Sequence, residues 1–91
     1  MDDRHDWYEF LMDAADAPDA LVRVLTVLAV QPLDITGVTM TRGDHSCSIH
    51  VGVRSVEPAR VETLRRRLEG LSVVRSVGLS WGSAQNSTEA L

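Results

Sequence analysis

Few side chains in this 91-residue sequence are suited to chemistry at neutral pH. They are three histidines and a single cysteine, and two of the histidines share the stretch DHSCSIH with Cys47. The spacing of His45, Cys47 and His50 matches no standard zinc pattern. On a strand, Cys47 and His50 would also point to opposite faces. We therefore predict a buried cysteine and a surface histidine, with no metal site and no cofactor.

Other catalytic arrangements are also missing from the sequence. It contains no glycine-rich phosphate loop, and nothing supports an activated nucleophile. An acylphosphatase-like enzyme would need an arginine in the loop after the first strand, where this chain has Asp16 and Asp19. The Arg42-Gly43-Asp44 tripeptide is typical of a turn. We predict that the protein is not an enzyme.

One junction could bind a small anion. The stretch ADAPDALVRVL (15–25) leads from a predicted strand into a predicted helix, and the free N–H groups of a helix N-terminus suit a carboxylate. The alternative is that the junction only begins the helix. In that case Asp16 caps it, Asp19 completes a capping box, and Pro18 lies in the first turn.

The hydrophobic periodicity predicts four strands and two helices. Alternation and β-branched residues indicate strands at 7–14, 33–42, 46–54 and 73–81. Helical spacing indicates helices at 16–31 and 56–70, ended by Pro32 and Gly70. Gly37 in the second strand indicates either a bulge or a close backbone approach, and residues 42–45 indicate a hairpin turn.

The same patterns predict the core. The strands should bury one face each and the helices one stripe each. The expected core residues are Tyr8, Phe10, Met12, Ala14, Leu21, Val24, Leu25, Leu28, Cys47, Ile49, Val51, Val53, Val61, Leu64, Leu68, Val77, Leu79 and Trp81.

The order β-α-β-β-α-β predicts an α+β, ferredoxin-like fold. Two helices would cover one face of a four-stranded antiparallel sheet. We expect one domain at 7–81, a flexible N-terminus at 1–6 and a disordered polar tail at 82–91.

Composition and charge limit the function classes. A net charge of -4 argues against nucleic acid as the main partner. The longest apolar stretch, residues 21–30, is too short to span a membrane, and a single cysteine favours the cytoplasm. In the second helix, Glu62 and Glu69 can pair with Arg66 and Arg65 at i,i+4 spacing. This cluster indicates a solvated helix face or, alternatively, a site for an acidic partner.

Residues 7–81 resemble an ACT domain, the small amino-acid-sensing module of biosynthetic enzymes. The resemblance is carried by the strand WYEFLMDA, the loop DAPDAL, the helix VRVLTVLAVQ and the strand LDITGVTM. Length and layout are most similar to the short regulatory subunits of acetolactate synthase, isozyme II type. These also end with a helix like EPARVETLRRRLEGL and a strand like VVRSVGLSW.

The resemblance implies a homodimer. ACT domains pair side by side along their second strands, which would place at the edge Ile35, Thr36, Gly37, Val38, Thr39, Met40 and Thr41. Ligand-binding members hold an amino acid at that seam, and the matching positions here are Asp16, Pro18, Asp19, Leu21, Thr36 and Gly37.

The first loop departs from the family pattern at one position. Where the family has Asn/Asp-x-Pro-Gly-x-Leu, this chain has Asp19 in place of glycine. That carboxylate would repel a ligand carboxylate and compete for the same helix donors. The leading hypothesis is therefore a regulatory subunit that binds and modulates the catalytic subunit of acetolactate synthase. The alternative is a free-standing sensor of a branched-chain or similar amino acid.

Overall fold

The computed structural model describes residues 7–30, 33–54 and 57–82. Its six elements follow the predicted order, and the structure confirms the α+β, ferredoxin-like fold. The elements are β1 (Trp7–Ala15), α1 (Ala20–Ala29), β2 (Asp34–Arg42), β3 (Ser46–Arg54), α2 (Pro58–Glu69) and β4 (Val74–Gly82). The expected flexible segment 1–6 and all but Gly82 of the expected tail lie outside the described residues, whereas Gly82 itself ends β4.

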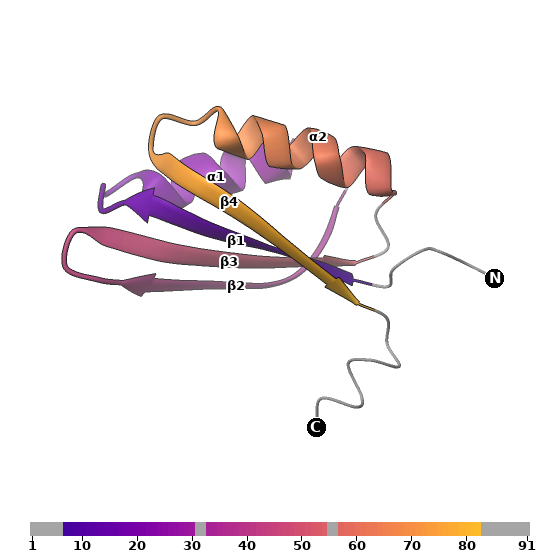
Figure 1. Cartoon of the computed structure of the whole chain (residues 1–91), viewed down its shortest axis with the longest axis horizontal. Coiled ribbons are helices and arrows are strands. Elements are labelled where there is room, and N and C mark those ends of the chain that lie inside the picture. The colour runs from indigo at the N-terminus through magenta and orange to yellow at the C-terminus, as the bar shows by residue number, and fades with distance from the viewer. Residues whose placement is uncertain (1–6, 31–32, 55–56, 83–91) are drawn as a thin grey trace, which may run out of the picture.

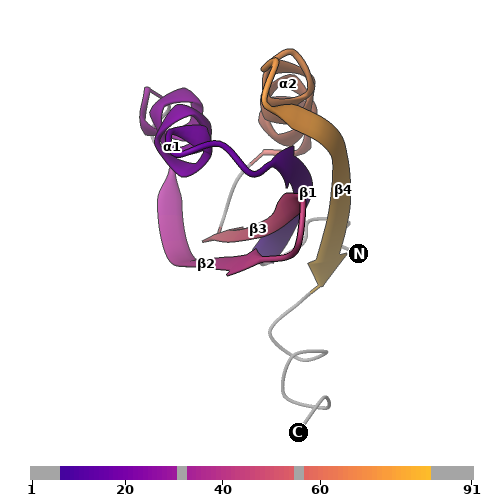
Figure 2. The same ribbon diagram turned by 90° about the vertical axis from the view of Figure 1, so that its left-hand side faces the viewer.

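The four strands form one antiparallel sheet in the order β2-β3-β1-β4. Both helices lie on one face of it, α1 on the β2 side and α2 on the β4 side (Figures 1 and 2). The other face carries no helix (Figure 2). Neither helix is long and apolar enough to cross a membrane, in the part of the chain that the structure describes.

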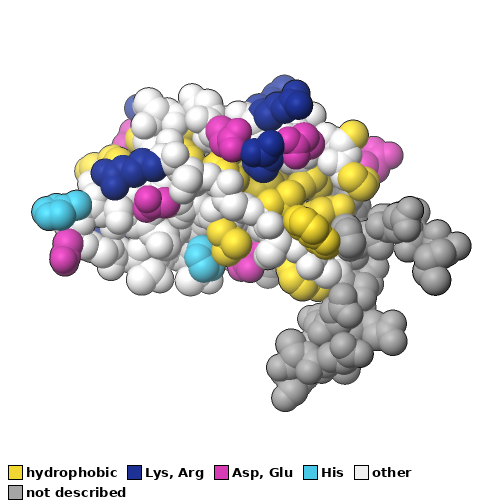
Figure 3. All heavy atoms as spheres, in the orientation of Figure 1, with side chains coloured by type: hydrophobic (Ala, Val, Ile, Leu, Met, Phe, Trp, Pro, Cys, Tyr) yellow, Lys and Arg dark blue, Asp and Glu magenta, His cyan; other side chains and the backbone are white. Residues whose placement is uncertain are grey.

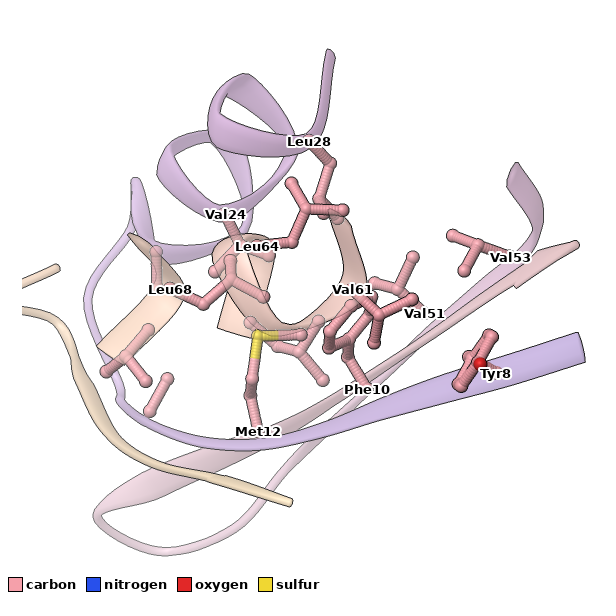
Figure 4. Close-up of a cluster of buried hydrophobic side chains, with 14 of the residues drawn as sticks. Tyr8, Phe10, Met12, Val24, Leu28, Val51, Val53, Val61, Leu64 and Leu68 are labelled. Carbon is pink, nitrogen blue, oxygen red and sulfur yellow. The ribbon is translucent and has the colours of Figure 1, made fainter. Parts of the chain in front are cut away.

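Cross-strand register fixes which residues meet in the core. Phe10 of β1 lies between Val51 of β3 and Leu79 of β4, and directly paired residues share a face of the sheet. This face meets the buried helix stripes, including Val24 and Leu64 (Figure 4). The core among the described residues buries no charged side chain and consists of hydrophobic residues, with Tyr8 contributing a hydroxyl group.

The prediction for α1 was wrong at its start. The helix begins at Ala20 rather than near Asp16, so Pro18 lies in the turn before it. The buried stripe is Ala20, Val24 and Leu28, while Leu21 and Leu25 are half-buried. The stripe predicted for α2 is confirmed, and Gly70 is the C-cap residue.

Two other expectations changed at the edges of the sheet. Trp81 was expected in the core, but β4 is an edge strand and Trp81 is 53% exposed. Of the two alternatives for Gly37, the structure supports the bulge, because the β2–β3 register shifts between Ile35 and Gly37. Apart from its chain neighbours, no atom of the described residues lies within 4 Å of a Cβ built on Gly37, so there is no close approach. Every residue of β2 is exposed, although all of them except Thr36 pair with β3.

Candidate functional site

The β1–α1 loop consists of residues 16–19. Its backbone turns tightly, with the Ala17 N–H donating to the Ala15 carbonyl at 2.8 Å and the Ala20 N–H donating to the Ala17 carbonyl at 3.1 Å. This turn separates the end of β1 from the first residue of α1. The loop therefore places Asp16 and Asp19 beside the N-terminus of α1.

The predicted capping box is absent. Asp19 occupies the N-cap position, but its side chain makes no capping hydrogen bond. Its carboxylate instead accepts a hydrogen bond from Arg23 Nε at 2.6 Å. This bond from Arg23 lowers the pKa of Asp19 below its usual value. The backbone of Asp19, with φ of -102° and ψ of 9°, is not in the extended conformation typical of a capping residue, in agreement with the missing cap.

Asp16 is paired as well. Its Oδ1 lies 3.4 Å from Arg42 Nε, at the last residue of β2. Both aspartates of the loop thus have an arginine partner. Their repulsion of a ligand carboxylate is weaker than the sequence alone indicated, because each partner cancels part of the charge. Neither of these aspartates caps the helix by its side chain, so the structure overturns the expected competition for the N-terminal donors of α1.

The six candidate effector residues fall into two groups. Asp16, Pro18, Asp19 and Leu21 lie at the loop, near the Arg42 end of β2. Thr36 and Gly37 lie at least five residues back along the same strand, which corresponds to about 17 Å. One chain does not bring the two groups together. An antiparallel neighbour along β2 would place its own Thr36 and Gly37 nearer this loop, since antiparallel strands run in opposite directions.

The edge of β2 carries an apolar row. Ile35, Val38 and Met40 pair with core residues of β3, so they lie on the helix side of the sheet. They are nevertheless 37%, 41% and 38% exposed. We call these three residues the β2 apolar row. The strand β2 therefore exposes its backbone edge and apolar side chains together.

The structure confirms the buried cysteine and the surface histidine predicted in the 44–50 segment. Cys47 is buried, and its Sγ donates to the Ala15 carbonyl at 3.6 Å. His50 lies on the helix-free face, where its Nδ1 is 3.8 Å from Glu9 Oε2. Among the described residues, no group of three histidine, cysteine or acidic side chains could hold a metal ion.

Sequence reasoning missed Arg23 and Arg42 as partners of the loop. The i,i+4 spacing of Asp19 and Arg23 was a usable signal. The pairing of Asp16 with Arg42 had no local signal, because it joins residues that only the folded sheet brings together.

Solved structures share this fold. The ACT domain of GTP pyrophosphokinase from Chlorobium tepidum is 12% identical with a TM-score of 0.74, over 85% of this chain and 100% of that one. The C-terminal domain of the MgtC protein from Mycobacterium tuberculosis is 19% identical with a TM-score of 0.72, over 92% and 95%. A homoserine dehydrogenase from Thiobacillus denitrificans is 16% identical with a TM-score of 0.74, and the match covers 88% of this chain and 18% of the enzyme.

The sequence itself was also compared with known families and with curated proteins. None of the curated proteins matches it. The family described as ACT-like domain matches residues 1–86. ACT domains are regulatory, non-catalytic modules. With the fold and the family match in agreement, the chain belongs to the ACT-like domain family.

Proposed function

We propose that this ACT-like domain is a regulatory protein that forms a homodimer through β2 and binds and modulates a catalytic subunit. The candidate partner is acetolactate synthase, in branched-chain amino-acid biosynthesis. The observation that carries the proposal is the β2 edge, where an open backbone and the β2 apolar row occur together.

An edge strand of this kind is a liability in a lone molecule. Its free N–H and C=O groups can pair with any other strand. Between Gly37 and Arg42 the strand is regular, because the bulge lies at its other end. Six regular residues give about 20 Å of edge. Pairing with a second copy would satisfy these groups and cover Val38 and Met40, which supports a twofold seam here.

The choice of partner enzyme rests on the resemblance in length and layout to the short regulatory subunits of acetolactate synthase. The same fold also accompanies catalytic domains, as in the ACT domain of GTP pyrophosphokinase and in homoserine dehydrogenase. An ACT-like domain that acts on an enzyme is consistent with these arrangements.

Two measurements test the proposal. Sedimentation should give a dimer for the wild type and a folded monomer for the double variant Val38→Asp/Met40→Asp, because buried unpaired carboxylates are costly at a seam. The control is Val22→Asp, at a residue of α1 that is 63% exposed, which should remain dimeric. The wild type should also bind the acetolactate synthase catalytic subunit and change its rate. A wild type that stays monomeric, or that leaves the enzyme unbound and its rate unchanged, would contradict the proposal.

A second function, amino-acid sensing at the seam, is favoured by the pairing of both loop aspartates with arginines. The N-terminal donors of α1 have no side-chain cap from Asp19 and could receive a ligand carboxylate. Thr36 and Gly37 of the neighbouring copy would complete the pocket. Thermal-shift screening with the common amino acids tests this function. A ligand at 100 times its dissociation constant adds about 2.7 kcal/mol, and no shift with any of them would rule it out.

A further inference from the structure

We propose that α2 carries a second interaction surface, which binds an acidic segment of the partner protein. The surface consists of Arg60, Arg66 and Arg67, and we call it the arginine face. The inference rests on the proposed function, since it supplies the chemistry of the contact between this domain and the enzyme that it regulates.

Helical spacing divides the polar residues of α2 into two flanks. The buried stripe of Val61, Leu64 and Leu68 faces the sheet. Residues three, four or seven apart lie on one side of a helix. One flank therefore carries Glu62, Arg65 and Glu69. The opposite flank carries Arg60 and Arg67, seven residues apart, and Arg66 lies on the outer side between the two flanks.

In the first flank, the charges of the arginine and the two glutamates are paired with one another. Arg65 Nη1 donates to Glu69 Oε2 at 2.7 Å, and its Nε donates to Glu62 Oε2 at 3.2 Å. A further contact joins Arg65 Nη2 to Glu62 Oε1. These bonds lower the pKa of Glu62 and raise the pKa of Arg65, mainly through the hydrogen bond between them. One arginine thus occupies both glutamates of the helix.

The arginine face has much weaker compensation, a single long ion pair at Arg66. Arg66 is 76% exposed and only 3.9 Å from Glu62, which is already bonded to Arg65. Arg60 and Arg67 form no ion pair with any carboxylate of the described residues. Three guanidinium groups, of half-buried Arg60 and exposed Arg66 and Arg67, therefore share little more than two turns of one helix. The described chain uses their affinity for carboxylates only in the long Arg66–Glu62 pair.

Orientation separates this surface from the β2 edge. In Figure 3 an acidic–basic–acidic row runs along the side of α2 toward β4, above hydrophobic side chains. The buried stripe of α2 faces the sheet, so Arg66, on the opposite side of the helix, points away from the sheet. Figure 2 places α2 away from β2. A dimer paired along β2 would present two arginine faces, one in each half, both free of the seam.

The distribution of charge favours an acidic protein over nucleic acid. Residues 57–82 contain five arginines and three glutamates, whereas the described residues from 7 to 54 contain three arginines and six acidic residues. A long polyanion would meet this negative remainder, and the arginine face contains no aromatic side chain for base stacking. A short acidic segment of a protein can contact the arginine face alone.

Arg66 and Arg67 also have a structural role, because cations in the last turn of a helix interact favourably with its dipole. A purely structural role would affect folding but not ligand binding. The test must therefore measure binding by variants shown to be folded.

The experiment uses the full chain and a short polyglutamate peptide, with amide chemical shifts followed by NMR at about 20 mM ionic strength, where screening is weak. Shifts should concentrate on α2. The variant Arg66→Glu/Arg67→Glu should bind at least about tenfold more weakly. The matched control, Arg54→Glu/Arg75→Glu, makes the same change in net charge at exposed arginines outside α2 and should bind with less than a twofold change. If charge reversal unfolds the helix, the neutral variants Arg66→Gln/Arg67→Gln and Arg54→Gln/Arg75→Gln are measured in place of the charge-reversed variant and its control.

The outcomes separate the two proposals. Peptide shifts away from α2, equal loss in the variant and control, or tighter binding of oligothymidylate than of polyglutamate would overturn the arginine face. The same variants are then tested on the acetolactate synthase catalytic subunit. If Arg66→Glu/Arg67→Glu binds this subunit as tightly as the wild type does, the arginine-face proposal is overturned and the proposed function stands. Absence of binding by the wild type would count against the proposed function, while the peptide result still decides the inference.

Discussion

At the scale of single residues, the two glycines of β4 have different surroundings. A Cβ on Gly82 would lie 2.6 Å from Trp7 Cζ2 and 2.9 Å from Trp7 Cε2, whereas a Cβ on Gly78 would meet Leu11 atoms at 3.6 Å or more. The Trp7 ring thus packs directly over the backbone of Gly82, its partner in the sheet. Gly82 does not have the left-handed backbone that glycine alone favours. The glycine is needed there for space.

Gly82→Ala should therefore destabilise the domain while Gly78→Ala should not. Overpacking costs about 1–3 kcal/mol, and in a domain of this size each kcal/mol lowers Tm by roughly 4–8 °C. Gly78→Ala should stay within about 0.5 kcal/mol of the wild type. Chemical unfolding of both variants measures the difference. Equal stabilities would show that Trp7 can move aside at little cost.

The first loop shows what local sequence rules could and could not predict. The rule for capping boxes placed the start of α1 at Asp16, yet the helix begins at Ala20. In the structure Asp19 bonds to Arg23, and Asp16 lies beside Arg42, which is far away in sequence. Competition between local and long-range partners cannot be resolved from spacing alone.

At the scale of elements, α2 owes part of its stability to the Glu62–Arg65–Glu69 row. Because the pKa of Glu62 is lowered in the folded state, its contribution to stability is present above the unfolded pKa. The contribution is lost as pH falls from the ordinary glutamate pKa of 4.5 toward the lower folded value. The effect is small, since these groups are exposed and screened by salt.

Acidification should therefore weaken the wild type more than a variant without this pair. Tm measured from neutral pH down to about pH 3 should fall less steeply in Glu62→Gln than in the wild type, at low salt. Glu57→Gln removes a carboxylate that forms no ion pair within the described residues, and it should follow the wild-type slope. Parallel curves for all three proteins would mean that the row contributes nothing measurable.

The strands were predicted more accurately than the helix start, for a physical reason. Alternation from Tyr8 to Ala14 and from Cys47 to Val53 reports directly which face is buried. The exposure of β2 was not readable in this way. The edge position of Ile35, Val38 and Met40 was expected from the resemblance to ACT domains and not from periodicity, and the position of their strand in the sheet explains their exposure.

At the scale of the whole molecule, a small domain with such an edge gains stability from association. If the folded state is a dimer and the unfolded state a single chain, stability depends on concentration. A tenfold increase in protein concentration adds about 1.4 kcal/mol to the free energy of unfolding of the dimer, half of it for each chain. Tm should rise by about 3–5 °C.

Calorimetry over two decades of concentration measures this shift. The Val38→Asp/Met40→Asp variant should melt at one temperature throughout, because it has no seam to lose. A wild type with a constant Tm over the same range would argue against dimerisation.

The candidate site was only partly predictable, because in the proposed dimer a second copy would complete its two groups of residues. The sequence identified Asp16, Asp19, Thr36 and Gly37, but a single fold keeps the loop and the two β2 residues about 17 Å apart along the strand. Whether they form one pocket depends on quaternary structure, which periodicity within one chain does not encode.

The exposure of all nine residues of β2 has a consequence for folding. Without a companion, this strand is held mainly by its ladder to β3, and its amides should open to solvent exchange before those of β1, which is paired on both sides. Stable ordering of β2 and binding of a second copy would then be coupled. In the proposed dimer, association would protect β2 of each subunit from opening.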